Sequence, residues 1–355
     1  MQTMPLVYNL VLLAADAVAV SMIARRRTPR SLLWAGFGVV AVAVTLPTLF
    51  EQDGFAVMAL WCQAIFLHGV ACFAASAWIF RRDSRRLALF CGAVAASVAA
   101  IGLDAFFVEP HWLEITHLRL RSPRLTRPVR IVAIADLQTD EVGDYEREVL
   151  RRAMEEHPDL LLFLGDYTQE HDGARRPALM RAVRELFREA GFAAPLGAVA
   201  IAGNTDAADW SGLFAGLPVT LADTTRSVDA GDEIRITALS TQDARNTRLQ
   251  LAPEKDRYHI VIGHFPDFAL GDVQADLLLA GHTHGGQVRL PFYGPLLTLT
   301  AVPRSWAVGV TDLGDGRTLV VSRGIGMERG QAPRLRFLCR PELVVIDLEP
   351  GEVTR

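Results

Sequence analysis

The pattern of apolar and polar positions divides the chain into two parts. Four long apolar stretches precede residue 108, at about 5–24, 31–50, 55–80 and 87–107. Each reaches the roughly 20 residues that an α-helix needs to cross a bilayer. Beyond residue 108 the apolar runs are short and continuous, as in strands that are buried on both faces. We therefore predict a membrane domain with four transmembrane helices at 1–107, a linker and first strand at 108–130, and a folded domain at 131–355.

Other features of the first part agree with a membrane domain. Trp34, Trp61 and Trp78 lie near ends of the apolar stretches, where interfacial aromatic residues are enriched. The mean hydropathy of the chain, +0.22, is high for a soluble enzyme. The first stretch lacks a basic n-region and a clear cleavage site, so we interpret it as a retained helix and not as a signal peptide.

The arginines predict the orientation of these helices. Arg25–Arg27 and Arg30 lie between the first two stretches, and Arg81–Arg86 carries four arginines between the third and fourth. The positive-inside rule places both loops in the cytoplasm and the domain after residue 108 outside it. Five arginines between residues 119 and 130 oppose this orientation, unless they belong to the folded domain, as the strand-like alternation of Leu113–Arg121 indicates. These arginines either form a solvated strand edge or attract anionic lipid head groups.

Three ionisable residues lie in or near the apolar stretches. Asp104 is close enough to a helix end to reach the interface, and we expect His68 to hydrogen-bond between helices. An intramembrane carboxylate such as Asp16 can mark a functional pathway. A transporter with an accessory domain is therefore an alternative, although one carboxylate is thin support for it.

The charge of the chain excludes one class of partner. The net charge is −4 and the isoelectric point is near 6.2, so we expect no nucleic-acid partner. The four cysteines have neither a pairing pattern nor the spacing of a metal site. Neither feature predicts the oligomeric state.

Five short apolar runs in the second part each end in a residue type that binds metals. In chain order, the residues that follow these runs are Asp136, Asp166, Asn204, His264 and Gly281–Gln287. In open α/β sheets, ligand sites form beyond the carboxyl ends of the strands. We therefore expect these five positions to form a site beyond the ends of the strands.

Helical segments separate the first strands. We expect a helix over 145–157, capped by Asp144 and stopped by Pro158, and another over 177–190, with Gly191 just past its end. Alternating strands and helices indicate an α/β layer structure. Further strands near 234–239, 319–322 and 343–348 have less helix between them, which favours a second sheet.

The segment Gly281-His282-Thr283-His284-Gly285-Gly286-Gln287 carries the strongest chemical signal. Neutral imidazole is a good ligand for zinc, iron and manganese. The flanking glycines allow the backbone to approach a charged centre closely, because they have no Cβ. The alternative is a solvated turn that is rich in histidine.

The order of these motifs resembles that of the calcineurin-like metallophosphoesterase family, and most closely its bacterial membrane-attached branch. The resemblance covers roughly residues 114–348 and includes Gly281–Pro291 and the tail Val321–Gly326. It implies an α/β fold, a four-layer α-β-β-α sandwich, here preceded by four transmembrane helices. It also implies a multi-pass protein of the bacterial cell membrane that hydrolyses a phosphomonoester, phosphodiester or pyrophosphate bond by a metal-bridged hydroxide.

The resemblance further implies two divalent metal ions, which we expect to be Mn, Fe, Zn or Mg. The first ion would be bound by Asp136, Gln138, Asp166 and His284. The second ion would be bound by Asp166, Asn204, His264 and His282. Among these ligands, the catalytic residues would be Asp166, Asn204 and His264.

Two positions depart from the family pattern. Where the family usually has Asp-x-His, this chain has Asp136-Leu137-Gln138, and Gln138 offers only a neutral carbonyl oxygen. Where the family usually has Gly-Asn-His, this chain has Gly203-Asn204-Thr205. General acid catalysis contributes about 10²–10⁴-fold to a rate. Its loss predicts either a slow enzyme or a substrate with a good leaving group, such as a pyrophosphate.

Other polar residues near these motifs have two interpretations each. His171 either replaces the missing imidazole or is solvated, and Asp140 and Asp206 either add charge to the site or cap turns and helices. Arg323 and Arg289 either clamp a phosphate or form structural ion pairs. We leave all five outside the catalytic set.

Two classes of function follow. The first is a membrane-anchored phosphoesterase that acts on a lipid-linked or envelope substrate. The alternative is a degenerate, non-catalytic domain that binds or senses phosphate on a membrane base, which Gln138 and Thr205 favour. Retention of six ligand residues at strand ends favours the enzyme.

Overall fold

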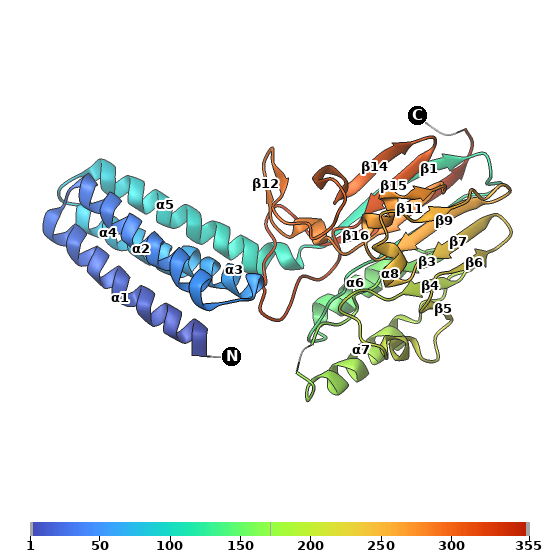
Figure 1. Ribbon diagram of the computed structural model, residues 1–355, viewed down its shortest axis with the longest axis horizontal. Coiled ribbons are helices and arrows are strands. Elements are labelled where there is room, and N and C mark those ends of the chain that lie inside the picture. Colours follow the sequence, from blue (N-terminus) through green and yellow to red (C-terminus); the bar gives the residue numbers. More distant parts are fainter. Residues whose placement is uncertain (1–2, 171, 353–355) are drawn as a thin grey trace. The chain divides into compact units, whose positions relative to one another are not determined.

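The computed structural model describes residues 3–170 and 172–352, and these form two compact units. The first comprises the helices up to Phe107 together with Gln331–Arg334. The second comprises Val108–Gly330 and the chain from Leu335 onward. The elements of each unit are labelled in Figure 1.

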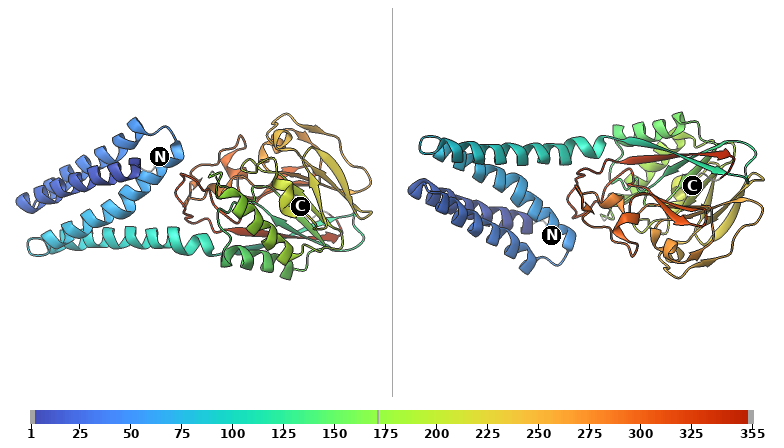
Figure 2. Two further views of the ribbon diagram at one scale, coloured as in Figure 1. Left: turned by 90° about the horizontal axis from the view of Figure 1, so that it is seen from below. Right: turned by 90° about the horizontal axis from the view of Figure 1, so that it is seen from above.

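The first unit consists of helices that run alongside one another (Figure 2). Its elements are α1 (Thr3–Arg26), α2 (Pro29–Phe50), α3 (Gly54–Gln63), the π-helical segment η1 (Ala64–Gly69), α4 (Val70–Phe80), α5 (Arg85–Leu103) and the π-helical segment η2 (Asp104–Val108). Within the described residues, four continuous helices are long and apolar enough to cross a membrane: Met4–Arg26, Pro29–Phe50, Gly54–Phe80 and Arg85–His111. Their outer faces expose large apolar side chains such as Leu33, Phe37 and Trp78, as lipid-facing surfaces do.

A buried polar network connects the helices of this unit. The His68 ring contacts the Asp16 carboxylate at 2.6 Å through Nδ1 and the Asn9 Oδ1 at 2.9 Å through Nε2. The Cys72 thiol donates to the other oxygen of Asp16 at 3.1 Å. The expectation that His68 hydrogen-bonds between helices is confirmed, and Asp16 has partners that offset the cost of its burial.

Two six-stranded sheets form the centre of the second unit, counted over the described residues. The first sheet contains, in spatial order, β1 (Glu114–Ser122), β16 (Glu342–Pro350), β2 (Val129–Ile134), β3 (Leu160–Phe163), β4 (Ala198–Ile201) and β5 (Val219–Ala222). The second contains β14 (Gly309–Gly314), β15 (Arg317–Val321), β11 (Leu277–Ala280), β9 (Tyr258–Gly263), β7 (Ile234–Ala238) and β6 (Arg226–Ala230). Strands β2 to β5 are parallel, as are β7, β9, β11 and β15.

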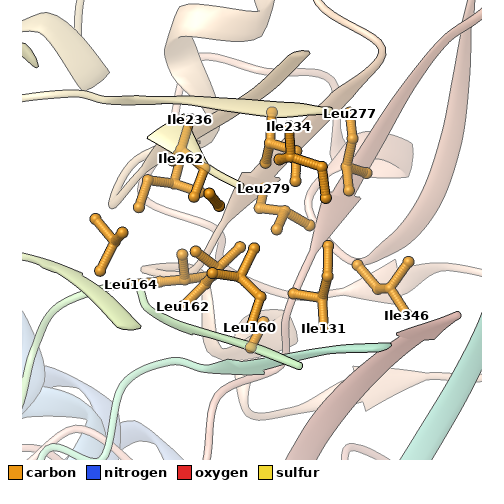
Figure 3. Close-up of a cluster of buried hydrophobic side chains, with 14 of the residues drawn as sticks. Ile131, Leu160, Leu162, Leu164, Ile234, Ile236, Ile262, Leu277, Leu279 and Ile346 are labelled. Carbon is orange, nitrogen blue, oxygen red and sulfur yellow. The ribbon is translucent and has the colours of Figure 1, made fainter. Parts of the chain in front are cut away.

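The two sheets face each other across an apolar core. Alternate side chains of β2 and β3, such as Ile131 and Leu162, point toward Ile236 and Ile262 of the opposite sheet (Figure 3). The intervening side chains of β2 and β3 point outward and are also buried, which is why these runs are continuously apolar in the sequence.

Helices cover the outer faces of both sheets, so the second unit has four layers. α6 (Asp144–Glu155) and α7 (Arg176–Ala190) pack on the first sheet. The short α8 (Thr241–Ala244) and the 3-10 helix η5 (Pro266–Leu270) pack on the second. The predicted α-β-β-α fold is therefore confirmed, with a thin outer layer on the second sheet.

The helix boundaries follow the sequence closely. Gly191, with φ of 77°, ends α7 as expected. The cap of α6 differs from the prediction: Gly143 is the N-cap residue, its N–H donates to Glu146 Oε2 at 2.9 Å, and Asp144 is the first helical residue. An acidic residue is favourable at that position because of the helix dipole.

β1 is an edge strand, as its alternating pattern predicts. Arg121, Arg124 and Arg130 form ion pairs with acidic residues of the same unit, namely Glu349, Asp276 and Asp347. These three arginines therefore belong to the folded domain. They therefore oppose an extracytoplasmic location of the domain less strongly than their position close to the fourth apolar helix indicates.

Small two-stranded ladders complete the unit. These are β8 (Gln250–Leu251) with β10 (Asp272–Val273), and β12 (Arg289–Leu290) with β13 (Gly294–Pro295). The β12–β13 hairpin directly follows the Gly-His-Thr-His segment.

Candidate metal centre

Strained backbone marks the ends of the central strands. Among the seven expected metal ligands, the residues with φ between 37° and 67° are Asp136, Gln138, Asp166, His282 and His284. A non-glycine residue held at positive φ costs about 1–3 kcal/mol, and such residues cluster at functional sites. Neighbouring loops hold this conformation: Asp136 N–H donates to Gly165 O at 3.0 Å, and Gln138 N–H to Asp166 O at 2.8 Å.

Two glycines allow other loops to approach Asp136. A Cβ on Gly281 would lie 2.6 Å from Asp136 Oδ2, and a Cβ on Gly324 would lie 2.7 Å from Asp136 Cβ. Both distances are too short for any side chain. Gly281 and Gly324 therefore allow two loops to pack directly against Asp136.

Asp136, Asp166 and His264 converge from three different strands. Each offers one ligand atom within 4.8 Å of the others, and all three side chains are buried. His264 Nε2 lies 3.3 Å from Asp166 Oδ2, and His264 Nδ1 lies 3.9 Å from Asp136 Oδ1. The structure thus brings together the ends of β2, β3 and β9.

The contacts of His264 favour a cation beside its Nε2 atom. Its Nδ1 lies 2.9 Å from the carbonyl oxygen of Leu164, so Nδ1 carries the proton. Its Nε2 then faces two oxygens, Asp166 Oδ2 and, at 2.9 Å, Asn204 Oδ1. Three lone pairs pointing at one spot repel each other unless a proton or a metal ion lies between them.

Three buried side-chain atoms of the expected metal ligands have no hydrogen-bond partner among the residues that the structure describes. They are Asp136 Oδ2, Gln138 Oε1 and His284 Nδ1. Buried polar atoms of native proteins are nearly always paired, so unpaired ones require an explanation. These atoms belong to three of the four residues that we expect to bind the first ion, and a divalent metal would satisfy all of them.

The amide of Gln138 is held with its oxygen free. Its Nε2 donates to Gln169 Oε1 at 2.9 Å and to Glu328 Oε2 at 3.1 Å. Gln169 Nε2 in turn donates to Glu328 Oε1 at 2.5 Å, and Arg329 N–H donates to Gln169 Oε1 at 2.6 Å. Both amide hydrogens of Gln138 are therefore used, and Oε1 is left as a ligand atom.

His282 and His284 stay neutral in this environment. Burial, with His264 nearby, lowers the pKa of His282 to about 4. Burial lowers the pKa of His284 well below its usual value, and Arg336 adds to this shift. His282 Nε2 lies 3.1 Å from Leu299 O, and its backbone N–H donates to Asp136 Oδ1 at 2.9 Å. Neutral imidazoles are the form that binds metals.

The charged groups at the centre shift one another's pKa. Burial favours a neutral His264, but Asp166 and Asp136 outweigh it and raise the pKa of the imidazole to about 9. Burial also opposes ionisation of Asp166, but His264 and the N–H of Thr205 lower the pKa of this carboxyl below its usual value. Burial raises the pKa of Asp136. Without a metal ion, a proton on His264 thus balances the carboxylates.

Asp206 positions the loops that carry two of the ligands. Its carboxylate accepts from the backbone N–H groups of Asp166 at 2.7 Å, Tyr167 at 2.8 Å and Gly203 at 2.8 Å. The turn interpretation of Asp206 is thus correct. Asp140 forms an ion pair with Arg329 at 3.6 Å. His171 lies outside the described residues.

The structure also decides between the two interpretations of Arg323. Its guanidinium pairs with Glu342 at 2.9 Å and Glu114 at 3.1 Å, so it is a structural residue. Arg289 lies on β12, at the start of the hairpin.

Sequence reasoning missed Arg336, which is fully buried. Its guanidinium donates to carbonyl oxygens of Cys339 at 3.0 Å and Arg323 at 2.8 Å, and to those of Gly324 and Gly326. Gly326 N–H in turn donates to Asp136 O at 2.6 Å. Arg336 therefore shapes the loop that lies against Asp136. Its surrounding sequence has no feature that distinguishes it from a solvated arginine.

Comparison with known proteins identifies relatives of this chain. Residues 129–286 match the family model described as calcineurin-like phosphoesterase. The chain is 32% identical over 279 residues to the uncharacterized metallophosphoesterase YkuE of Bacillus subtilis, covering 73% of this chain and 94% of YkuE. It is 26% identical to the phosphodiesterase YaeI of Escherichia coli, covering 73% of this chain and 97% of YaeI. Among solved structures, a Pseudomonas putida nuclease MPE is similar over 56% of this chain and 76% of its own, with 18% identity and a TM-score of 0.30.

Proposed function

The chain belongs to the calcineurin-like metallophosphoesterase family and is a hydrolase of phosphoester bonds, and on that basis we propose that it is a membrane-anchored phosphoesterase with two divalent metal ions. One observation carries the metal part of this proposal. Ligand atoms of Asp136, Gln138 and His284 are buried without a partner among the described residues, beside a histidine whose Nε2 faces two oxygens.

The ligands divide into two sets. Asp136, Gln138, Asp166 and His284 would hold the first ion, and Asp166, Asn204, His264 and His282 the second. When bound, the ions would polarise the phosphoryl group and lower the pKa of a water molecule between them. Mixed nitrogen and oxygen ligands suit Mn, Fe or Zn, and the neutral amide of Gln138 makes the first site the weaker one.

The protein's own residues hold and orient these groups. Asp166 is fixed by the N–H of Thr205, which donates to its Oδ1 at 2.8 Å, and its loop is fixed by Asp206. His264 is fixed by its hydrogen bond to Leu164 O. Asn204 is the exposed member of the second set, so it is the ligand that can meet substrate from solvent.

The missing imidazole at position 205 restricts the substrate. The hydroxyl of Thr205 is buried and has no partner among the described residues, and a hydroxyl of ordinary pKa is a poor proton donor to a leaving group. The enzyme therefore favours esters whose leaving group departs without a proton, such as a pyrophosphate or an activated phosphodiester.

The four apolar helices favour a membrane location for this chemistry. We infer that they span the bilayer, that the arginine loops Arg25–Arg30 and Arg81–Arg86 face the cytoplasm, and that the domain lies on the opposite side. A domain held at the membrane surface meets lipid-linked or envelope phosphoesters at high local concentration. These are the natural substrates that we propose.

The proposal is tested by hydrolysis assays on the full chain in detergent with Mn²⁺. We expect hydrolysis of p-nitrophenyl phosphate or bis-p-nitrophenyl phosphate, and a loss of about 10²-fold or more in His282→Ala, because a ligand of the second ion is removed. Arg188→Ala, an exposed change on α7, should keep the full rate. Equal rates in the His282→Ala variant and the wild type would contradict the proposed ligand set.

A further inference from the structure

The hairpin after the metal-binding loop exposes an apolar surface. We define the hairpin surface as the large side chains of this segment that are at least two-fifths exposed: Leu290, Phe292, Tyr293, Leu296, Leu297 and Leu299. Phe292 is fully exposed at the tip (111%). Soluble monomers rarely concentrate so many large apolar side chains in one exposed segment, and such patches mark interaction sites.

The charge of this segment identifies the chemistry of its partner. From Gly285 to Thr311 the sequence contains no aspartate or glutamate, but it contains Arg289 and Arg304. The Arg304 guanidinium lies over the Tyr293 ring, 4.1 Å from its centroid. Apolar and aromatic side chains flanked by arginines are typical of segments that enter the interface of an anionic bilayer.

Backbone contacts connect the hairpin to the first residues of the second unit. Arg289 N–H donates to Phe337 O at 2.9 Å, and Phe337 N–H donates to Gln287 O at 2.8 Å. The next two residues, Leu338 and Cys339, donate their N–H groups to the carboxylate of Glu109. Glu109 lies in the 3-10 helix η3 (Glu109–His111), which is the last turn of the apolar helix Arg85–His111 and already part of the second unit. The hairpin therefore lies on the side of the domain where the chain enters it.

The same side carries a second pair of this type. The Arg340 guanidinium lies 3.5 Å from the centroid of the Trp112 ring, and about half of Trp112 is exposed. Only Trp112 and Leu113 separate the helix from β1. A domain attached by so short a connection stays at the bilayer surface if the helix spans the membrane.

The hairpin also adjoins the metal-binding loop. Its end supplies Leu299 O to His282 Nε2 at 3.1 Å. At Gly286, a Cβ would lie 2.6 Å from Pro295 Cβ and 2.8 Å from Leu297 O, so the hairpin packs directly on the loop. One continuous stretch of chain thus joins the apolar surface to the ligands.

We propose that the hairpin surface, with Arg289 and Arg304, docks into the interface of an anionic bilayer and admits an amphiphilic phosphoester whose acyl chains stay in the membrane. This inference rests on the proposed phosphoesterase function. It assigns the apolar part of the substrate to the hairpin and the phosphoryl group to the metal centre.

The test uses the full chain in nanodiscs that contain phosphatidylglycerol. Two substrates share one leaving group: water-soluble bis-p-nitrophenyl phosphate, and the p-nitrophenyl ester of a phosphatidic acid held in the disc. For the double variant Phe292→Ser and Tyr293→Ser, we expect the rate on the lipid ester relative to the soluble ester to fall by at least about tenfold, since two apolar side chains no longer enter the bilayer. The matched control is Leu270→Ser, an exposed leucine on η5, which should keep the wild-type ratio. An unchanged ratio in the double variant would overturn the proposal.

A second measurement does not depend on activity. A fluorophore is attached to Phe292→Cys or to Leu270→Cys after the half-buried Cys62 and Cys72 are replaced by alanine. Nitroxide-labelled acyl chains should quench the probe at residue 292 and spare that at 270. If aqueous iodide quenches both probes equally and the lipids quench neither, the docking surface is refuted. Failure of the wild type to hydrolyse either ester would instead contradict the proposed phosphoesterase function, whatever the quenching result.

Discussion

At the scale of single residues, the contacts of Gln138 hold its amide in the orientation that a metal ligand would need. Gln169 and Glu328 accept both of its amide hydrogens, which fixes the orientation of the amide and leaves Oε1 unpartnered among the described residues. The sequence predicts Gln138 as a ligand from its place after Asp136. It does not predict Gln169 or Glu328, because their contact depends on a distant loop that comes close only in the folded chain.

Replacing Gln169 should therefore weaken the first metal site. In Gln169→Ala, the amide of Gln138 can rotate, and loss of such an orienting partner typically lowers metal affinity by about 10–100-fold. Titration of Mn²⁺ against a competing fluorescent chelator measures this change. Gln274→Ala is the control, because the Gln274 amide donates to Asp272, before β11, and not to a residue of the metal centre. Equal affinity in both variants would show that Gln138 needs no orienting partner.

The pKa of His264 predicts the pH dependence of metal binding. Near pH 7 the imidazole carries a proton, because Asp166 and Asp136 raise its pKa to about 9, and a metal ion must displace that proton. The apparent affinity should then rise with pH, by up to about tenfold per unit for each proton released, and level off above pH 9. Calorimetric titration with Mn²⁺ between pH 6 and pH 8 tests this. A constant or falling affinity would contradict the charge balance described for the centre.

At the scale of elements, the sequence predicts most of the frame of the site. The apolar runs become β2, β3 and β4 of the first sheet and β9 and β11 of the second. The polar residues that follow them meet because the two sheets face each other with the carboxyl ends of these strands close together. The predicted helix α6 is also present, although its cap is Gly143. Periodicity does not predict the path of Gly324–Gly326, because the carbonyl groups of Gly324 and Gly326 accept hydrogen bonds from the buried Arg336.

Arg336 should therefore be important for the stability of the second unit. Arg336→Leu removes the donor to several buried carbonyl groups, and each unsatisfied group costs about 1–3 kcal/mol. We expect the apparent unfolding temperature, followed by intrinsic fluorescence in detergent, to fall by several degrees or more. Arg188→Leu, which removes an exposed arginine of α7, should change it little. Similar unfolding temperatures for both variants would mean that the loop is held by other contacts.

At the scale of the whole molecule, the chain combines a helical unit with a metallophosphoesterase domain. The length and apolarity of the four helices are predictable because a bilayer imposes both. The sequence does not predict whether the arginines after residue 118 affect the orientation, because their acidic partners come close only in the folded chain. Three of them pair with Glu349, Asp276 and Asp347, and this leaves the two arginine loops as the main signal of orientation.

That orientation gives a further prediction. Alkaline phosphatase fused to the C-terminus should be active in a bacterial host, because it folds only after export, and a fused green fluorescent protein should stay dark. The same reporters fused in the loop between α2 and α3, which carries no positive charge, should give the same result. Bright fluorescence with an inactive phosphatase at the C-terminus would place the domain in the cytoplasm.

The central claim is that the ends of the two sheets form a two-metal centre, and the metal content of the purified full chain tests it most directly. Elemental analysis after equilibration with Mn²⁺ should give about two ions per wild-type chain. His284→Ala should retain about one, since only the first site loses a ligand, and Asp166→Ala should retain fewer, since it loses the ligand that both ions share. One ion or none in the wild type, or the same content in all three proteins, would contradict the assignment.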